Sequence, residues 1–145
     1  MLASNASYAT APVACRRPAV PACDPTVIST GTNPPAVGSL ILVKLGDVID
    51  VGLDWSDWLD VNGGKLETSA WAAHGSSPKA PTLSNTTLID ENSKHTLCIL
   101  DTGEAEAGDV YWITNTVTVE GVAAAGGFTM PTRTLNRLIA VKVVA

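Results

Sequence analysis

Short runs of alternating apolar and polar residues, separated by turn residues, fill the sequence from residue 37 to its end. The clearest run covers residues 109–119, where Tyr111, Ile113 and two valines alternate with Trp112 and three threonines. A period of two residues is that of a β-strand with one buried face, and no stretch has a convincing helical period. About seven such runs, at spacings of about 8 to 12 residues, predict an all-β fold, an antiparallel sandwich.

Turn residues set the limits of the predicted strands. Asn62-Gly63-Gly64 is a strong turn signal, and serines and prolines break the chain between residues 76 and 81. A loop is expected over Glu120 to Pro131. The seven predicted strands cover residues 40–44, 48–55, 66–74, 83–90, 95–101, 109–119 and 135–144.

The first 36 residues differ from the rest, with six of the nine prolines and only three charged residues. Proline removes a backbone N–H donor and keeps its predecessor extended, so neither a long helix nor a central strand can pass through this segment. The chain therefore divides into an extended, irregular arm over residues 1–36 and a sandwich over residues 37–145. Because the arm is poor in charge, we expect it to dock on a partner rather than remain solvated. The candidate contacts are its large side chains, Leu2, Tyr8, Val13, Val20, Val27 and Ile28.

A tyrosine near the start of one predicted strand indicates an immunoglobulin-like sandwich. Tyr111 follows the turn at Ala107-Gly108-Asp109, as the tyrosine of a tyrosine corner does. Ile113 takes the position, two residues later, where antibody domains carry their second cysteine. Trp71, on an earlier strand, is then the expected core tryptophan. We expect Trp55, Trp71, Tyr111 and Ile113 to lie in the core.

Two aromatic residues are candidates for partner contacts outside the arm. Trp58 follows Trp55 by three residues at a predicted strand end, so the two rings would point to different sides. The alternative, that both tryptophans pack in the core, stays open. Phe128 ends a loop of small residues and fits a contact that orders on assembly, although a loop that contacts nothing is the alternative.

Charge and cysteine content exclude several classes. With 14 acidic and 9 basic residues the net charge is −5, which argues against a nucleic-acid partner. The sequence has no apolar run long enough to span a membrane and no basic segment followed by an apolar core at its start, so neither membrane insertion nor a secretory signal is expected. Cys98 is expected to be a buried thiol. A bridge between Cys15 and Cys23 is conceivable.

Five aspartates between residues 47 and 60 raise the question of a Ca²⁺ site. On a strand, Asp50 and Asp54 share one face about 13 Å apart, too far to share an ion. A solvated acidic edge is the favoured interpretation. A Ca²⁺ site where Asp57 and Asp60 meet another loop is the alternative.

No catalytic motif accompanies the two histidines. His74 and His95 could be combined with Ser76, Ser77 and Asp101 into a hydrolase site. The sequence, however, has no Gly-x-Ser-x-Gly, His-Glu-x-x-His or Cys-x-x-Cys motif. No catalytic residue, cofactor or metal is therefore predicted.

Several short motifs together resemble a family of small tailed-phage virion proteins, the fibre-tail adaptor or neck proteins. They are Asp-Trp-Ser-Asp-Trp-Leu at 54–59, Thr-Ser-Ala-Trp at 68–71, Ala-Gly-Asp-Val-Tyr at 107–111 with Thr-Asn-Thr-Val-Thr at 114–118, Arg-Thr-Leu at 133–135 and Ile-Ala-Val-Lys-Val at 139–143. The resemblance covers about residues 45 to 145 and implies an immunoglobulin-like module without catalytic residues. The loop over residues 120–131 is longer than the turn that the family pattern has at this place. The arm lies outside the shared region.

The expected function is that of a non-enzymatic structural component of a tailed-phage virion, at the neck or tail, which attaches fibres or links tail to head through its arm. The partners would be other virion proteins (portal, adaptor, tail, fibre or major capsid protein) in many symmetric copies, and the location would be the virion, assembled in the host cytoplasm. One alternative is a capsid decoration protein that clamps shell subunits. Another is a carbohydrate-binding module with Trp58 or Trp112 on an exposed face.

Overall fold

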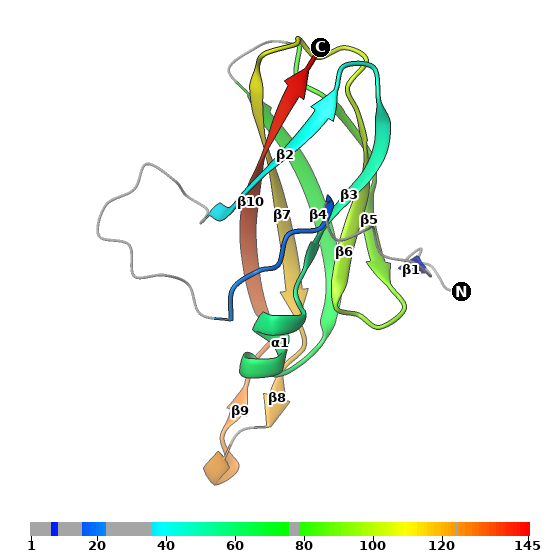
Figure 1. Ribbon diagram of the computed structural model, residues 1–145. Coiled ribbons are helices and arrows are strands. Elements are labelled where there is room, and N and C mark those ends of the chain that lie inside the picture. Colours follow the sequence, from blue (N-terminus) through cyan, green and yellow to red (C-terminus); the bar gives the residue numbers. More distant parts are fainter. Residues whose placement is uncertain (1–6, 9–15, 23–35, 76–78, 124) are drawn as a thin grey trace.

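The computed structural model describes residues 7–8, 16–22, 36–75, 79–123 and 125–145, and these residues form an all-β sandwich (Figure 1). The strands are β1 Ser7–Tyr8, β2 Ala36–Lys44, β3 Val48–Asp54, β4 Leu66–Gly75, β5 Thr82–Asp90, β6 His95–Asp101, β7 Val110–Val119, β8 Val122–Ala123, β9 Thr129–Met130 and β10 Arg133–Val144. A helix, α1, covers Ser56–Asn62, and a 3₁₀ turn, η2, covers Ala125–Gly127.

Two four-stranded sheets form the sandwich, with strand orders β1-β5-β6-β3 and β2-β10-β7-β4. The orders β5-β6-β3 and β10-β7-β4 are those of strands D-E-B and G-F-C of the immunoglobulin fold. The antiparallel expectation needs correction at two sheet edges, because β1 pairs with β5 and β2 pairs with β10 in parallel. Parallel pairing is possible there because the paired strands are far apart in the sequence, so no tight turn has to join them.

The helix α1 corrects the expectation of a chain without helices. The side chain of Asp54 accepts hydrogen bonds from the backbone N–H (2.9 Å) and the hydroxyl of Ser56. A carboxylate bonded to the backbone two residues on forms a tight turn, which ends β3 and redirects the chain into α1. Trp58 and Leu59 then face the core from the helix. The seven residues of α1 are too few to show a helical period, so the sequence pattern does not predict the helix.

Aliphatic and aromatic side chains from both sheets fill the core. The largest fully buried ones are Trp55, Tyr111, Leu53, Leu97, Leu100, Ile113, Ile139, Val20, Val43, Val51, Val117 and Val119. Strands β3 and β6 approach closely at Gly52, where an added Cβ would lie 2.0 Å from the carbonyl oxygen of Thr96. Glycine is required at that position because real Cβ atoms do not come so near a backbone oxygen.

Residues 16–22 pack against the sandwich beside β3. The N–H of Val20 donates to the carbonyl of Asp54 (2.8 Å), whose own N–H donates to the carbonyl of Pro18 (3.0 Å). Arg16 forms an ion pair with Asp50 at 2.9 Å. The side chain of Val20 is fully buried in the core. The segment predicted as a docking arm over residues 1–36 therefore includes a stretch that packs as part of the sandwich.

Candidate functional site

A buried polar network joins the two sheets at Asn115 on β7. The Oδ1 atom of Asn115 accepts hydrogen bonds from Trp55 Nε1 (3.1 Å) and Thr96 Oγ1 (2.7 Å). Its Nδ2 atom donates to Ser69 Oγ (2.9 Å) and to the carbonyl of Ala70 (3.1 Å). Because all four hydrogen-bonding positions of the buried amide are used, the network stabilises one relative position of the sheets and leaves no polar group free to act on a ligand.

The residues expected in the core are buried. Trp55, Tyr111 and Ile113 are inaccessible to solvent, and Trp71 on β4 is nearly so. The hydroxyl of Tyr111 accepts the N–H of Glu106 at 3.1 Å. A tyrosine that bonds back to the backbone a few residues upstream is the geometry of a tyrosine corner.

A charged cluster surrounds His95, at the start of β6. Its Nδ1 atom lies 2.6 Å from Asp90 Oδ2, and its Nε2 atom lies 2.9 Å from Arg17 Nη1 and 3.3 Å from Asp54 Oδ1. Burial would raise the pKa of Asp54, but the hydrogen bonds from Ser56 and the charges of His95 and Arg17 outweigh it and leave this pKa below its ordinary value. The cluster holds the segment 16–22 against the sandwich.

This cluster resembles a Ser-His-Asp constellation without its working geometry. Asp90 could orient His95, but the hydroxyl of Ser56 donates to Asp54. A nucleophilic serine would instead have to donate to the Nε2 atom of His95, where Arg17 lies. The arrangement supports a structural role for His95, which contacts Arg17 and so helps to hold residues 16–22 against the sandwich.

The structure separates the other residues that were considered for chemistry. His74 lies on β4 opposite Trp112, whereas His95 lies on the other sheet opposite Asp54. Ser76 and Ser77 lie outside the described residues, as do Cys15 and Cys23. Asp101 is exposed at the end of β6. Cys98 is buried and free, and burial raises the pKa of its thiol to about 12.

The expected solvated acidic edge holds for Asp47, Asp57 and Asp60, which are exposed, but not for Asp50 and Asp54. Both are half-buried, because Asp50 forms an ion pair with Arg16 and Asp54 contacts His95. Asp60 pairs with Lys94 at 3.4 Å. Among the described residues no group of three or more His, Cys, Asp or Glu side chains could hold a metal ion. In the same part of the chain no helix has the length and apolar character to cross a membrane.

Four of the eight large apolar side chains that are exposed among the described residues lie on the outer face of the sheet β2-β10-β7-β4. Leu40 on β2, Ala140 on β10 and Trp112 on β7 lie side by side in register. The next row holds Leu42, Lys142 and Val110. Trp112 is 42% exposed, Leu40 54% and Leu42 64%. We call the surface made by Leu40, Leu42, Val110 and Trp112, with the buried Ala140 and the exposed Lys142 between them, the Trp112 face.

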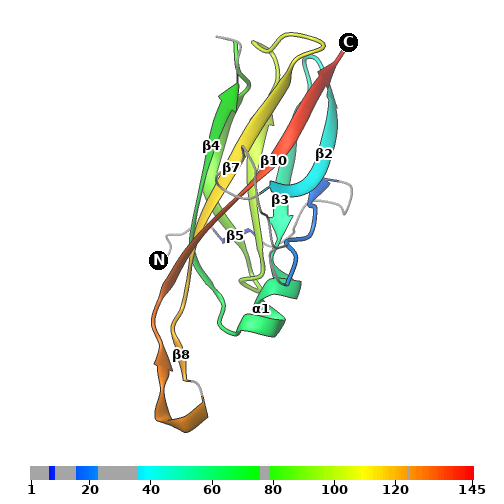
Figure 2. The ribbon, with the colours of Figure 1, turned by 90° about the vertical axis from the view of Figure 1, so that its left-hand side faces the viewer.

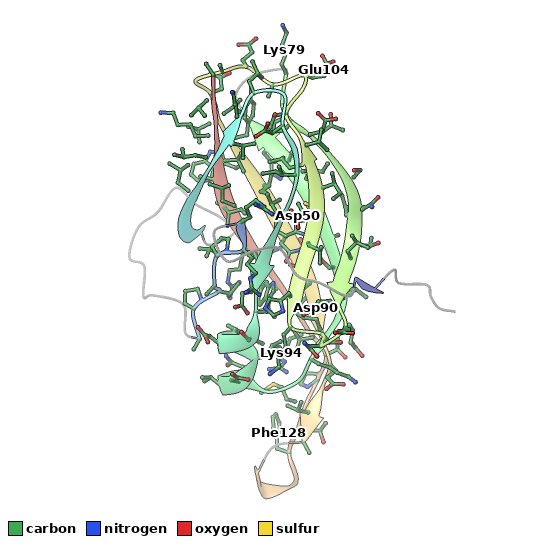
Figure 3. The ribbon with its side chains drawn as sticks, turned by 45° about the vertical axis from the view of Figure 1, so that its right-hand side comes forward. Asp50, Lys79, Asp90, Lys94, Glu104 and Phe128 are labelled. Carbon is green, nitrogen blue, oxygen red and sulfur yellow. The ribbon has the colours of Figure 1, made fainter. Side chains whose placement is uncertain are left out.

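The loop expected over residues 120–131 contains a small hairpin in which β8 pairs with β9. It projects past α1 at the end of the sandwich opposite the C-terminus (Figures 1 and 2). Arg133 fixes its base, because its guanidinium donates to the carbonyls of Asn62 (3.0 Å), Gly63 (2.9 Å) and Glu120 (3.1 Å). Phe128 lies on the hairpin, 61% exposed and away from the body of the molecule (Figure 3).

Two of the predicted partner contacts require correction. Trp58 is buried against Trp55, with ring centroids 6.1 Å apart, because α1 turns it back onto the core. Val20 is buried in the core of its own chain. Neither is available to a partner.

The remaining candidates divide between exposed and undescribed positions. Phe128 is exposed. Leu2, Val13, Val27 and Ile28 lie outside the described residues. The backbone of Tyr8 pairs with β5 opposite Asp90.

Sequence reasoning missed Asn115 and the leucines of β2. Asn115 lies two and four residues after Ile113 and Tyr111 in an alternating strand, so the alternation places its side chain on the same inward side. Leu40 and Leu42 lie in a run that is apolar at every position from 40 to 43, and periodicity cannot tell which leucines point outward there.

No protein-family model matches the chain, and no curated protein matches it. One solved structure with some likeness is a nucleoside hydrolase-related protein from Saccharophagus degradans that is associated with carbohydrate metabolism. The match covers 83% of this chain at 16% identity with a TM-score of 0.48, and the chain spans 25% of that protein. A likeness at this level bears on no functional residue of the chain.

Proposed function

We propose that the chain is a non-enzymatic structural component of a tailed-phage virion, at the neck or tail, which attaches fibres or links tail to head. The virion context comes from the motif resemblance over residues 45–145. The observation that carries the binding role is the Trp112 face, because exposed apolar groups that gather on one surface mark interaction sites. The partners are other virion proteins in symmetric copies, so that many weak contacts supply avidity.

The arm remains part of this proposal with a shorter extent. Residues 16–22 belong to the sandwich through Val20 and Arg16, so a deletion of residues 1–36 would damage the core. A deletion of residues 1–15 keeps these contacts. It is therefore the better test of whether the start of the chain attaches it to the particle.

The test is the presence and copy number of the chain in purified virions of the phage that encodes it. We expect a multiple of six or twelve copies, located at the neck or tail in a particle map, and a reduced copy number for Trp112→Ser. Val48→Ser, at a similarly exposed residue on the other sheet, is the matched control and should incorporate normally. Absence of the chain from virions overturns the proposal. Hundreds of copies over the shell support the capsid decoration role instead.

Carbohydrate binding is a second candidate, which the exposure of Trp112 favours. The indole of Trp112 is exposed on the outer sheet face beside the small side chain of Ala140, and an exposed indole can stack on a sugar ring. Glycan binding that Trp112→Ala abolishes would support this function. A glycan screen of the intact chain without hits would remove it.

A further inference from the structure

The segment 16–22 runs past the end of β3 and is held there by a small number of contacts (Figure 1). Arg16 donates to the backbone carbonyl and to the carboxylate of Asp50, both at 2.9 Å. Backbone hydrogen bonds join the middle of the segment to Asp54, and the side chain of Val20 is buried. None of these contacts involves a histidine, the side chain that ordinarily changes charge between about pH 5 and 8.

The contact of Arg17 with His95 is the exception. Arg17 Nη1 lies 2.9 Å from His95 Nε2, and this is the one hydrogen bond of the Arg17 side chain among the described residues. In the same part of the chain the buried Nε atom of Arg17 has no partner. The attachment of Arg17 to the sandwich therefore depends on the protonation of a single imidazole nitrogen.

This contact fixes the state of the His95 ring. A guanidinium carries donors and no acceptor, so the Nε2 atom of His95 must accept the hydrogen bond and cannot carry a proton. The Nδ1 atom then carries the ring proton and donates it to Asp90 Oδ2 at 2.6 Å. The contact with Arg17 therefore requires a neutral His95.

We propose that protonation of His95 releases Arg17 and loosens the segment 16–22, so that the segment is a pH-sensitive strap on the sandwich. A protonated Nε2 atom can only donate, and the acceptor that lies near it is Asp54 Oδ1 at 3.3 Å. The guanidinium of Arg17 then faces a second positive charge in place of a lone pair. This inference does not depend on the proposed role in a virion.

The charges around His95 favour uptake of the proton by the sandwich. Among the described residues the charged side chains that contact the ring are Asp90 at the end of β5, Asp54 at the end of β3 and Arg17 on the segment. Lys94, which precedes His95, forms its ion pair with α1 instead. With a neutral ring the cluster has two negative charges and one positive charge, and one added proton balances them.

The two carboxylates also have different roles when the ring is charged. Asp90 keeps the hydrogen bond from Nδ1, because that nitrogen carries a proton in both states of His95. Asp54 accepts the new bond from Nε2, and its pKa below the ordinary value keeps it ionised in mildly acidic solution. The sandwich gains a contact on protonation, and the contact that is lost belongs to the segment 16–22.

The first experiment observes the imidazole nitrogens of the full chain by NMR. At about pH 8 we expect His95 to have a protonated Nδ1 and an unprotonated Nε2, and at about pH 5 both should be protonated. His74, which is exposed on β4, serves as the internal control. The opposite tautomer at the higher pH, a ring already charged there, or a ring still neutral at the lower pH would overturn the inference.

The second experiment measures hydrogen exchange of the two amides that join the segment to β3. The amide of Val20 donates to the carbonyl of Asp54, and the amide of Asp54 donates to the carbonyl of Pro18. Exchange is followed at about pH 7.5 and about pH 5.5, with each rate corrected for the intrinsic rate at that pH. We expect the protection of both amides to fall roughly tenfold at the lower pH, while the amides of β7 keep theirs.

Neighbouring arginines provide matched variants. Arg17→Gln should lower the protection of the two amides at the higher pH and show no further loss at the lower pH. Arg16→Gln loses the ion pair with Asp50 but keeps the contact of Arg17 with His95, so its protection should be lower and should still fall roughly tenfold with pH.

His95→Gln removes the titrating ring and decides the outcome even where Arg17→Gln leaves too little protection to measure. The protection of its Val20 and Asp54 amides should be the same at both pH values, whereas His74→Gln should respond as the original chain does. Three results would overturn the inference: equal protection at both pH values in the original chain, a pH response that persists in His95→Gln, or a loss of protection that extends equally to β7.

Discussion

The indole Nε1 of Trp55 donates a hydrogen bond to Oδ1 of Asn115 at 3.1 Å, across 60 residues of sequence and from one sheet to the other. Trp55 marks the junction of β3 and α1, and Asn115 lies in the middle of β7. Both residues are fully buried. This bond therefore links the strand-to-helix turn to β7, one of the two inner strands of the opposite sheet.

Trp55 should tolerate replacement by phenylalanine less well than Trp71. Trp55→Phe removes a donor from the buried amide of Asn115, whereas the buried Nε1 of Trp71 has no hydrogen-bond partner among the described residues. Both variants lose similar aromatic area. We expect Trp55→Phe to lower the free energy of unfolding by roughly 1–2 kcal/mol more than Trp71→Phe, measured by urea denaturation. Equal losses would show that the bond adds nothing to stability.

Asp54 should make stability depend on pH in the acidic range. Its pKa in the folded protein lies below the ordinary value of 3.8, so the unfolded chain binds more protons at a given pH. The stabilisation from ionised Asp54 is therefore fully present above about pH 5 and is lost as the pH falls through the folded pKa. Denaturation at a series of pH values should give a shallower acid decline for Asp54→Asn. Asp57→Asn, on the exposed side of α1, is the control and should follow the original chain.

Cys98 should be unreactive until the sandwich unfolds. Burial raises the pKa of its thiol to about 12, so almost no thiolate exists near neutral pH. In a variant with Cys15→Ser and Cys23→Ser, a disulfide reagent should label Cys98 only after denaturant is added. Rapid labelling without denaturant would mean that the core opens locally at β6.

Arg133 should control the order of the hairpin. Arg133→Ala leaves the carbonyls of Asn62, Gly63 and Glu120 without their guanidinium donor. We expect the amides of β8 and β9 to exchange with solvent roughly tenfold faster, measured by hydrogen exchange and mass spectrometry. Lys142→Ala, at an exposed position near the far end of β10, should leave hairpin exchange unchanged. Unchanged exchange in Arg133→Ala would contradict the role assigned to Arg133.

The all-β class and the sandwich could be predicted because a strand with one buried face requires a residue period of two. That requirement is local, so the alternation in β7 shows it without knowledge of any partner strand. Tyr111 and Trp71 could be placed for a related reason, since a turn followed by a tyrosine is a local pattern. The inward position of Asn115 on β7 could be predicted in the same way, because Asn115 lies two residues after the inward-facing Ile113.

Contacts between residues far apart in the sequence could not be predicted, because they depend on how the strands pair. Val20 is buried because the segment 16–22 forms backbone hydrogen bonds with Asp54. The local pattern of apolar residues cannot predict a pairing between segments more than 30 residues apart. Trp58 points inward because the side chain of Asp54 accepts the N–H of Ser56 in a tight turn that ends β3. The predicted strand over residues 48–55 does not include this turn. The Trp112 face exists because β2 joins β10 in parallel and brings Leu40 level with Trp112. The preference of each residue for a strand with one buried face is a local property, whereas the pairing of the strands sets which apolar side chains remain exposed.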